Sequence, residues 1–298
     1  MPRRGTVLAR SGSIYRVSTA GGEVKAVLRG KAKRSDKERI VVGDRVILDR
    51  PDGATIVGIE PRRNVLDRRT PNGRGGKPVA ANLDRVMVLT AVMSPKPNLG
   101  LVDRLLVIAE ANEIAAGVVI TKTDLKTHAD LSHRFKTAGY PVWPVSIRTG
   151  DGIEELAAEM RGHVSLLTGA SGVGKSSLLN RIQPGLSLET GQISTKNQRG
   201  KNTTVTAVMV PMDQGGFVVD TPGFSDVGLW GIEPRALANC FPEIRRFVEH
   251  CRFADCHHLS EPGCAVRGAV EAGQIDAGRF DSYRTILKDL VATPRHWE

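Results

Sequence analysis

The sequence GASGVGKS, from Gly169 to Ser176, decides how the rest of the chain is interpreted. It follows the apolar run HVSLLT and precedes the run SLLNRI, so we expect a loop between a strand and an amphipathic helix. The pattern G-x-x-x-x-G-K-[ST] is that of a phosphate-binding loop (P-loop), because its glycines let successive backbone N–H groups point at phosphate oxygens. A glycine-rich turn that binds nothing is the alternative.

The P-loop pattern assigns a role to its polar residues. Lys175 would reach the β- and γ-phosphates, helped by the positive end of the helix that begins there, and the Ser176 hydroxyl would bind Mg²⁺. The nucleotide-binding residues expected in this stretch are Gly169, Ala170, Ser171, Gly172, Val173, Gly174, Lys175, Ser176 and Ser177.

Length and composition indicate a chain of several domains. With 298 residues, 40% of them hydrophobic, the chain is long enough for two or three domains with their own cores. No apolar run approaches the ~20 residues of a membrane span, and the N-terminus lacks the apolar region of a signal peptide. We therefore expect a cytoplasmic protein with no membrane partner.

Positive charge is concentrated in the first quarter of the chain. The whole protein carries a formal net charge of +10, but residues 1–78 alone hold 19 Lys and Arg against 8 Asp and Glu, a net of +11. The rest of the chain is close to neutral, at −1. This concentration is typical of a module that binds a polyanion, and it favours RNA over a merely solvated basic surface.

Residues 5–60 are expected to form a small closed barrel of the OB (oligonucleotide-binding) type. Five short, alternating runs, TVLAR, SIYRVS, EVKAVLRGK, DRVILD and ATIVGIE, are separated by turn signals such as Ser11-Gly12. Tyr15 is the only aromatic residue in this segment. We therefore expect contacts to the backbone of structured RNA rather than stacking on single-stranded bases.

Beyond a linker expected at 71–78, PNGRGGKP, apolar strands alternate with helical patterns up to and past the P-loop. This alternation predicts a mostly parallel sheet with helices on both faces. The predicted organisation is multidomain α/β: an N-terminal OB-type barrel (1–78), a central P-loop domain (79–232) and a C-terminal helical domain (233–298).

A second nucleotide motif precedes the P-loop. Thr121, Lys122, Thr123 and Asp124 follow the strand GVVI and resemble the guanine-reading N-K-x-D motif of GTPases. The Asp124 carboxylate would accept hydrogen bonds from the two donors on one edge of guanine, and the lysine stem would cover the base plane. Threonine in place of asparagine at 121 spares this carboxylate but is expected to weaken the support of the loop. Ser146, which ends the strand PVWPVS, resembles the second base-contacting loop.

Candidate residues for hydrolysis follow the P-loop helix. Residues 185–208 are expected to form a mobile loop in which Thr203 or Thr204 would reach Mg²⁺ or the γ-phosphate, ordinary strand-entry threonines being the alternative. Asp220 would hold the Mg²⁺ water, and the Gly223 N–H would sense the γ-phosphate. Phe224 stands where many GTPases have a water-orienting glutamine, so we predict slow intrinsic hydrolysis that needs a partner.

The order of these motifs indicates a circular permutation. In ordinary small GTPases the base-reading motif follows the P-loop and the D-x-x-G motif, whereas here it precedes both. The same sheet can be built from a permuted chain. In that arrangement the γ-phosphate-sensing segment leads directly into the C-terminal domain, so we expect its movement to pull on that domain.

A metal-ligand cluster is expected near the C-terminus. Cys251, Cys256, His258 and Cys264 supply three thiolates and one imidazole, a complete tetrahedral zinc set. His257 is a competing ligand, and free cysteines in a reduced cell are the alternative. Cys240 stands apart and is expected in the core. Helical segments are expected at 233–250, 265–273 and 276–291.

Together these features closely resemble the ribosome-small-subunit-dependent GTPase A (RsgA) family. The matching strings are ANLDRV, GASGVGKSSLLN, DTPGF and CRFADCHHLSEPGCAV, and the likeness covers nearly the whole chain. It implies an OB fold, a circularly permuted GTPase domain and a C-terminal domain whose zinc ligands include His258 rather than His257. Two residues depart from the family pattern: Thr121 replaces an asparagine, and Asn202 replaces a histidine that precedes the threonines.

The resemblance also implies a function and its partners. It implies GTP hydrolysis stimulated by the small ribosomal subunit in late 30S maturation, with rRNA and GTP/GDP as partners, and we expect a monomer. A non-enzymatic RNA-binding scaffold with a structural nucleotide is a second hypothesis. An ATP-driven RNA enzyme is a third, and Asp124 argues against it because its carboxylate suits guanine.

Overall fold

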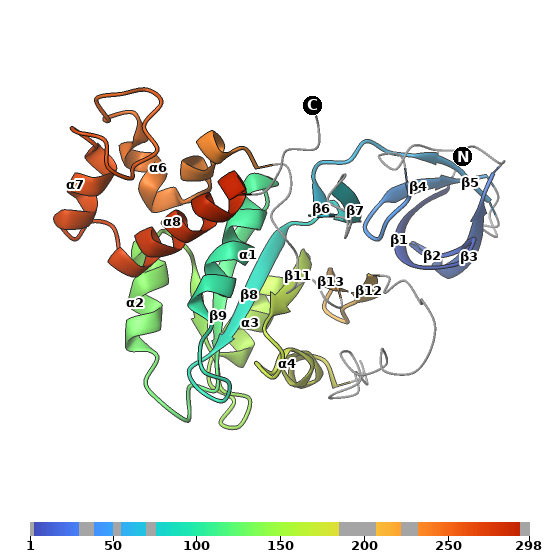
Figure 1. Ribbon diagram of the computed structural model, residues 1–298. Helices are drawn as coiled ribbons and strands as arrows, with labels where there is room; N and C mark the ends of the chain where they lie inside the picture. Colours follow the sequence, from blue (N-terminus) through green and yellow to red (C-terminus); the bar gives the residue numbers. More distant parts are fainter. Residues whose placement is uncertain are drawn as a thin grey trace.

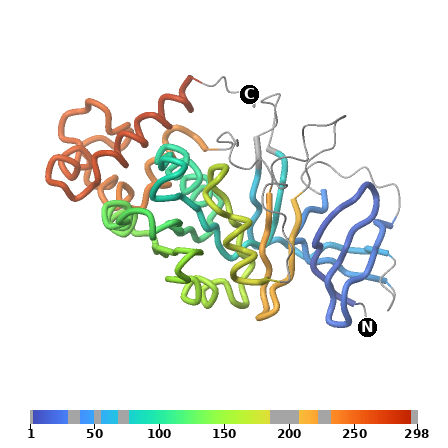
Figure 2. Tube along the Cα trace, turned by 90° about the horizontal axis from the view of Figure 1, so that it is seen from below, coloured from blue at the N-terminus to red at the C-terminus, as the bar shows by residue number. Residues whose placement is uncertain are grey.

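The computed structural model describes residues 3–29, 39–49, 55–69, 76–184, 207–221 and 232–292. Figure 1 shows three parts: a barrel from the N-terminal residues, a central sheet, and C-terminal helices on the other side of the sheet from the barrel. Figure 2, turned by 90°, shows the same succession. Among the described helices, none has the length and apolarity needed to cross a membrane.

Five strands close the N-terminal barrel, as the sequence predicts. They are β1 (Arg3–Ser11), β2 (Ile14–Thr19), β3 (Gly22–Leu28), β4 (Arg45–Leu48) and β5 (Thr55–Ile59). Their order, β1-β2-β3-β5-β4 with β1 pairing back to β4, confirms the OB-type barrel. Alternate residues such as Val7, Tyr15 and Val17 fill its core. Because Tyr15 is buried, it offers no stacking surface.

A hairpin joins the barrel to the sheet. Strands β6 (Val65–Arg69) and β7 (Gly76–Ala81) pair antiparallel. Residues 76–78 therefore belong to a strand, although a linker was expected at 71–78; residues 71–75 lie outside the described part. The Gly- and Pro-rich composition suggested a loop, but the strand accepts Pro78 because this residue lies where the register with β6 shifts, between Leu66 and Asp67.

The central sheet has six strands among the described residues, and its order confirms the mostly parallel arrangement. The order is β10 (Val142–Pro144), β9 (Ala115–Thr121), β8 (Arg85–Ala91), β11 (Val164–Gly169), β13 (Phe217–Asp220) and β12 (Val208–Pro211). All neighbours are parallel except β12 and β13, which are antiparallel. The P-loop strand β11 thus lies between β8, which precedes it in the chain, and β13, which follows it.

Helices cover both faces of this sheet. On one face lie α1 (Leu99–Ala111) and α2 (Ala129–Thr137), and on the other α3 (Ile153–Met160) and α4 (Lys175–Ile182). Along β8, Val86 and Val88 face the first cluster while Met87 and Leu89 face the second. Burial on both faces explains why this strand is a continuous apolar run rather than an alternating one.

The C-terminal part is helical and packs on α1. It comprises η4 (Pro234–Cys240), α6 (Pro242–Val248), α7 (Ala265–Glu271) and α8 (Ala277–Ala292), of which η4 and α8 contact α1. The helical segment expected at 233–250 is two helices, because Pro242 has no N–H to continue the first and begins the second. Cys240 is buried in this core, as expected.

Candidate nucleotide site and metal centre

The P-loop connects β11 to α4, as predicted. Gly169 ends β11 with a φ of 146°, and a Cβ at this position would lie 2.3 Å from the carbonyl oxygen of Leu89. Gly174, with a φ of 98°, turns the backbone into α4. Only glycine adopts these conformations without strain. The free N–H groups of the first turn of α4, which contains Lys175, Ser176 and Ser177, therefore lie at the loop.

Lys175 lies over the loop and near Asp220. Its Nζ donates to the carbonyl oxygens of Gly169 at 2.7 Å and Ala170 at 3.0 Å. Burial lowers the pKa of Lys175, and the charge of Asp220 opposes that shift. Burial raises the pKa of Asp220, and Lys175 opposes that shift in turn. The P-loop lysine and the expected Mg²⁺ carboxylate thus belong to one charged group at the ends of β11 and β13.

The Thr121–Asp124 segment is attached to the P-loop. The Thr121 Oγ1 lies 2.7 Å from the carbonyl oxygen of Val173 and 3.3 Å from that of Thr90, so its single proton is best placed for Val173. Lys122 donates from Nζ to the carbonyl oxygens of Gly172, at 3.0 Å, and of Ser94. Segments that are far apart in the sequence therefore form one site. Thr121 therefore supports the P-loop with its own hydroxyl group, although the motif of other GTPases has an asparagine at this position.

Asp124 is held by two donors from the loop after β10. The Ser146 hydroxyl donates to Oδ1 at 2.7 Å, and Arg148 Nε lies 3.0 Å from Oδ2. The hydrogen bond from Ser146 is the main cause that keeps the pKa of Asp124 below its ordinary value, and Arg148 acts in the same direction. The carboxylate is therefore ionised and can accept hydrogen bonds. Ser146 was expected from the sequence, whereas Arg148, two positions further on, was not.

Three expected switch residues lie outside the described part of the chain. These are Thr203, Thr204 and Gly223, and the same holds for Asn202 and Phe224. Of the residues expected to act in hydrolysis, Lys175 and Asp220 lie close enough for their charges to interact, and Ser176 follows Lys175 in the first turn of α4.

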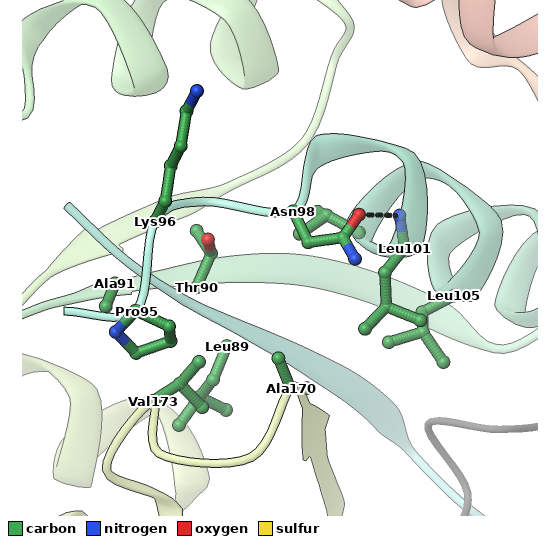
Figure 3. Close-up of a pocket in the computed structure, with 12 residues that line it drawn as sticks. Leu89, Thr90, Ala91, Pro95, Lys96, Asn98, Leu101, Leu105, Ala170 and Val173 are labelled. Carbon is green, nitrogen blue, oxygen red and sulfur yellow. Dashed lines mark hydrogen bonds between the residues drawn. The ribbon is translucent and has the colours of Figure 1, made fainter. Parts of the chain in front are cut away.

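A pocket opens on the side of the P-loop that faces α1 (Figure 3). Gly169, Ala170 and Val173 of the loop form one wall. At the rim, Asn98 Oδ1 accepts a hydrogen bond from the Leu101 N–H at 3.1 Å and so begins α1. The remaining lining is mostly aliphatic, so the P-loop has an apolar surface on this side.

The cysteine–histidine cluster forms a compact group. The ligand atoms of Cys251, Cys256, His258 and Cys264 all lie within 4.8 Å of one another. His258 Nδ1 is 3.5 Å from the Sγ atoms of both Cys251 and Cys264. A tetrahedral Zn²⁺ with Zn–S bonds of about 2.3 Å and a Zn–N bond of about 2.0 Å requires spacings of this order. The group could therefore bind zinc.

The competing ligand His257 is held in another way. Its backbone N–H donates to Glu261 Oε1 at 2.8 Å, and its carbonyl oxygen accepts from the Tyr283 hydroxyl at 3.0 Å. The ring of Tyr283 lies 6.0 Å from that of His258, centroid to centroid. The backbone of His257 thus helps to fix the loop, while His258 supplies the side chain that joins the cysteines.

Comparison with known proteins agrees with this geometry. A family model described as RsgA GTPase matches residues 59–230. The chain is 46% identical to the small ribosomal subunit biogenesis GTPase RsgA of Gemmatimonas aurantiaca, with 96% of this chain and 97% of that protein covered. It is 40% identical to the protein of the same name from Moorella thermoacetica, with 98% of each covered.

Two solved structures are similar over almost their whole length. The crystal structure of YjeQ from Thermotoga maritima gives a TM-score of 0.79 at 35% identity, covering 99% of this chain and 100% of that one. YloQ, described as a circularly permuted GTPase, gives a TM-score of 0.77 at 28% identity, covering 99% and 97%. These likenesses support the permuted strand order of the central sheet.

Proposed function

The chain belongs to the RsgA GTPase family, and we propose on that premise where it binds GTP and what stimulates hydrolysis. The observation that carries the proposal is the pair of hydrogen bonds from Thr121 and Lys122 to P-loop carbonyls. These bonds join the segment that ends in Asp124 to the loop that ends in Lys175. A single guanosine triphosphate would then lie between the base-reading carboxylate and the phosphate-binding lysine.

Each part of the nucleotide has a proposed partner. Asp124 accepts from the guanine edge, Lys122 covers the base, and Lys175 binds the β- and γ-phosphates. Ser176 and Asp220 hold Mg²⁺, which neutralises charge on the phosphates. Thr203 or Thr204, together with Gly223, completes the γ-phosphate environment. The full set proposed to bind GTP is Thr121, Lys122, Thr123, Asp124, Ser146, Gly169, Ala170, Ser171, Gly172, Val173, Gly174, Lys175, Ser176 and Ser177.

The proposed partner is the small ribosomal subunit, bound through its rRNA. The relatives are named small ribosomal subunit biogenesis GTPases, and family membership makes this chain a GTP hydrolase of ribosome biogenesis. The net charge of +11 in residues 1–78 supports RNA contact by the barrel. Hydrolysis would occur in the cytoplasm, in late maturation of the 30S subunit, and would release the protein. A scaffold with a structural nucleotide is not favoured by this family.

We further propose three functional regions and one Zn²⁺ per chain. The regions are an rRNA-binding barrel (1–78), a permuted GTPase domain (79–232) and a zinc-binding domain (233–298). Cys251, Cys256, His258 and Cys264 would hold the zinc and so fix a loop that has little core of its own.

The test of this function is the rate of GTP hydrolysis with and without purified small subunits. We expect slow intrinsic hydrolysis and a large stimulation by the subunits that weakens as salt rises. Lys175→Ala should abolish the stimulated rate, with Lys136→Ala on the surface helix α2 as the matched control. An unstimulated wild-type rate would contradict the proposal.

The base specificity has its own test. Asp124→Asn replaces one acceptor oxygen by a donor NH₂, which no longer matches the two donors of guanine but does match the carbonyl at position 2 of xanthine. The variant should therefore bind xanthosine diphosphate in preference to GDP, measured by competition against a fluorescent nucleotide. Binding of ATP as tightly as GTP by the wild type would instead favour an ATP-driven enzyme.

A further inference from the structure

The barrel packs directly on the strand that ends the central sheet. Leu8 on β1 and Val42 in the loop before β4 are buried in the same apolar cluster as Ala207 and Met209. Strands β1 and β12 are in contact, and Figure 2 shows the orange strands beside the blue barrel. Within the described residues, β12 therefore has β13 on one side and the barrel on the other.

A glycine turn brings the barrel this close. Gly43 has a φ of 86°, and a Cβ there would lie 2.0 Å from the carbonyl oxygen of Ala81 and 3.3 Å from Cε of Met209. The neighbouring Val42 carbonyl accepts a hydrogen bond from the Ala81 N–H at 2.9 Å. The turn before β4 thus touches both the hairpin strand β7 and the sheet strand β12, and a side chain at Gly43 would separate them.

Asn82 holds this turn in place. Its Nδ2 donates to the Gly43 carbonyl oxygen at 2.9 Å, and its Oδ1 accepts from the Arg63 N–H at 2.9 Å. The side chain is buried, so water competes little for these bonds. Asn82 belongs to the string ANLDRV, to which the nucleotide site gives no role. Its side chain connects the barrel to the segment that enters β8.

Strand β12 leads from this junction to the nucleotide site. Val208 is paired with Asp220, and Met209 with Val219, in the antiparallel register. Asp220 is the carboxylate that interacts with Lys175. If the barrel moved and β12 moved with it, the position of Asp220, the residue proposed to hold Mg²⁺, would therefore change.

We propose that Asn82 and Gly43 are positioning residues that couple the barrel to GTP hydrolysis through β12. RNA bound to the barrel steadies the turn at Gly43, the turn steadies Met209 and β12, and β12 fixes Asp220 for the hydrolytic step. The inference rests on the proposed function, because the quantity that it explains is stimulation by the small subunit.

Asn82→Asp tests this coupling with little change of shape. Aspartate keeps the acceptor for Arg63 and tolerates the positive φ of Asn82, but it replaces the donor to Gly43 by a carboxylate oxygen that repels the carbonyl. We expect the subunit-stimulated kcat to fall about tenfold, which corresponds to the loss of one buried hydrogen bond. The intrinsic rate and the KM for GTP should stay within about twofold. A purely structural role would instead lower the melting temperature and leave the stimulation ratio unchanged.

Asn112→Asp is the matched control. Asn112 also donates from Nδ2 to a backbone carbonyl, that of Ile108 at 2.7 Å, but at the end of α1 and away from the barrel. This variant should keep the wild-type stimulation. If wild type is stimulated and Asn82→Asp is stimulated equally, the coupling is overturned while the proposed function stands. If wild type itself is not stimulated, the proposed function fails as well.

Hydrogen exchange gives a second measurement, made on the wild type and on Asn82→Asp. Adding small subunits to the wild-type protein bound to a non-hydrolysable GTP analogue should slow amide exchange in β12 and at Asp220. In Asn82→Asp the barrel amides should still be protected by the subunit, while those of β12 should not. Unchanged exchange of β12 in the wild type on subunit binding would overturn the proposal.

Discussion

A single hydroxyl group shows how the site tolerates an unusual residue. Thr121 is fully buried, and its hydroxyl donates a hydrogen bond to the carbonyl oxygen of Val173. This bond supports the P-loop. Thr121→Val keeps the shape but leaves that carbonyl without its donor. We expect a loss of about 1–3 kcal/mol in the free energy of unfolding, measured by urea denaturation. Affinity for a fluorescent GDP analogue should fall in the same variant because the loop loses its support.

Thr121→Ser is the control for this change, since serine keeps the hydroxyl and removes only a methyl group. It should retain nucleotide affinity close to that of the wild type. Equal affinities for the valine and serine variants would mean that the hydroxyl does not support the loop. From the sequence alone, threonine was expected to weaken the support of the loop, because it replaces an asparagine. The hydrogen bond from its hydroxyl to Val173 could not be predicted, because Val173 lies 52 residues further along the chain.

At the scale of one element, the loop 251–264 contains two adjacent histidines, of which we expect only His258 to bind zinc. His258→Ala removes a side chain that lies 3.5 Å from two thiol groups, whereas His257→Ala leaves the backbone contacts of residue 257 in place. We expect zinc affinity to fall by more than about 100-fold in the first variant, since even changes around the ligands cost 10–100-fold. The His257 variant should keep one zinc per chain by elemental analysis. Loss of zinc from both variants, or from neither, would contradict the assignment.

Elements with strict local requirements could be predicted from the sequence. The P-loop needs glycine at 169 and 174 for its backbone angles, and the barrel strands alternate around a single core, so both patterns are visible in the chain. The role of Asn82 could not be predicted, because its partners Gly43 and Arg63 come from other segments of the chain. Arg148 was missed for the same reason: an exposed arginine in a loop carries no signal of the carboxylate that it will meet.

At the scale of the whole molecule, a buried ion network fixes the C-terminal helices to the central sheet. Arg279 on α8 is fully buried and bonds Asp103 on α1 at 2.8 Å and Glu243 on α6 at 2.6 Å. Its guanidinium also lies 4.7 Å from the centre of the Phe241 ring. The sequence suggested that the γ-phosphate-sensing segment would pull on this domain. The network opposes such a movement, because separating the helices would leave buried charges unpaired.

Arg279 is expected to contribute strongly to the stability of the protein. Arg279→Met keeps much of the side-chain volume but leaves Asp103 and Glu243 without their shared cation, so we expect the free energy of unfolding to fall by about 3–5 kcal/mol. Arg284→Met, on the same helix, removes an exposed pair with Asp281 and should change stability by less than about 1 kcal/mol. Adding Glu243→Gln to Arg279→Met should restore part of the loss, because the uncompensated charge of Glu243 is then gone, whereas Asp103 keeps its ion pair with Arg134 at 2.7 Å. Urea denaturation of the four proteins measures these differences. If Arg279→Met cost no more than Arg284→Met, the C-terminal helices would not be held by this network and would be free to follow the segment that precedes them.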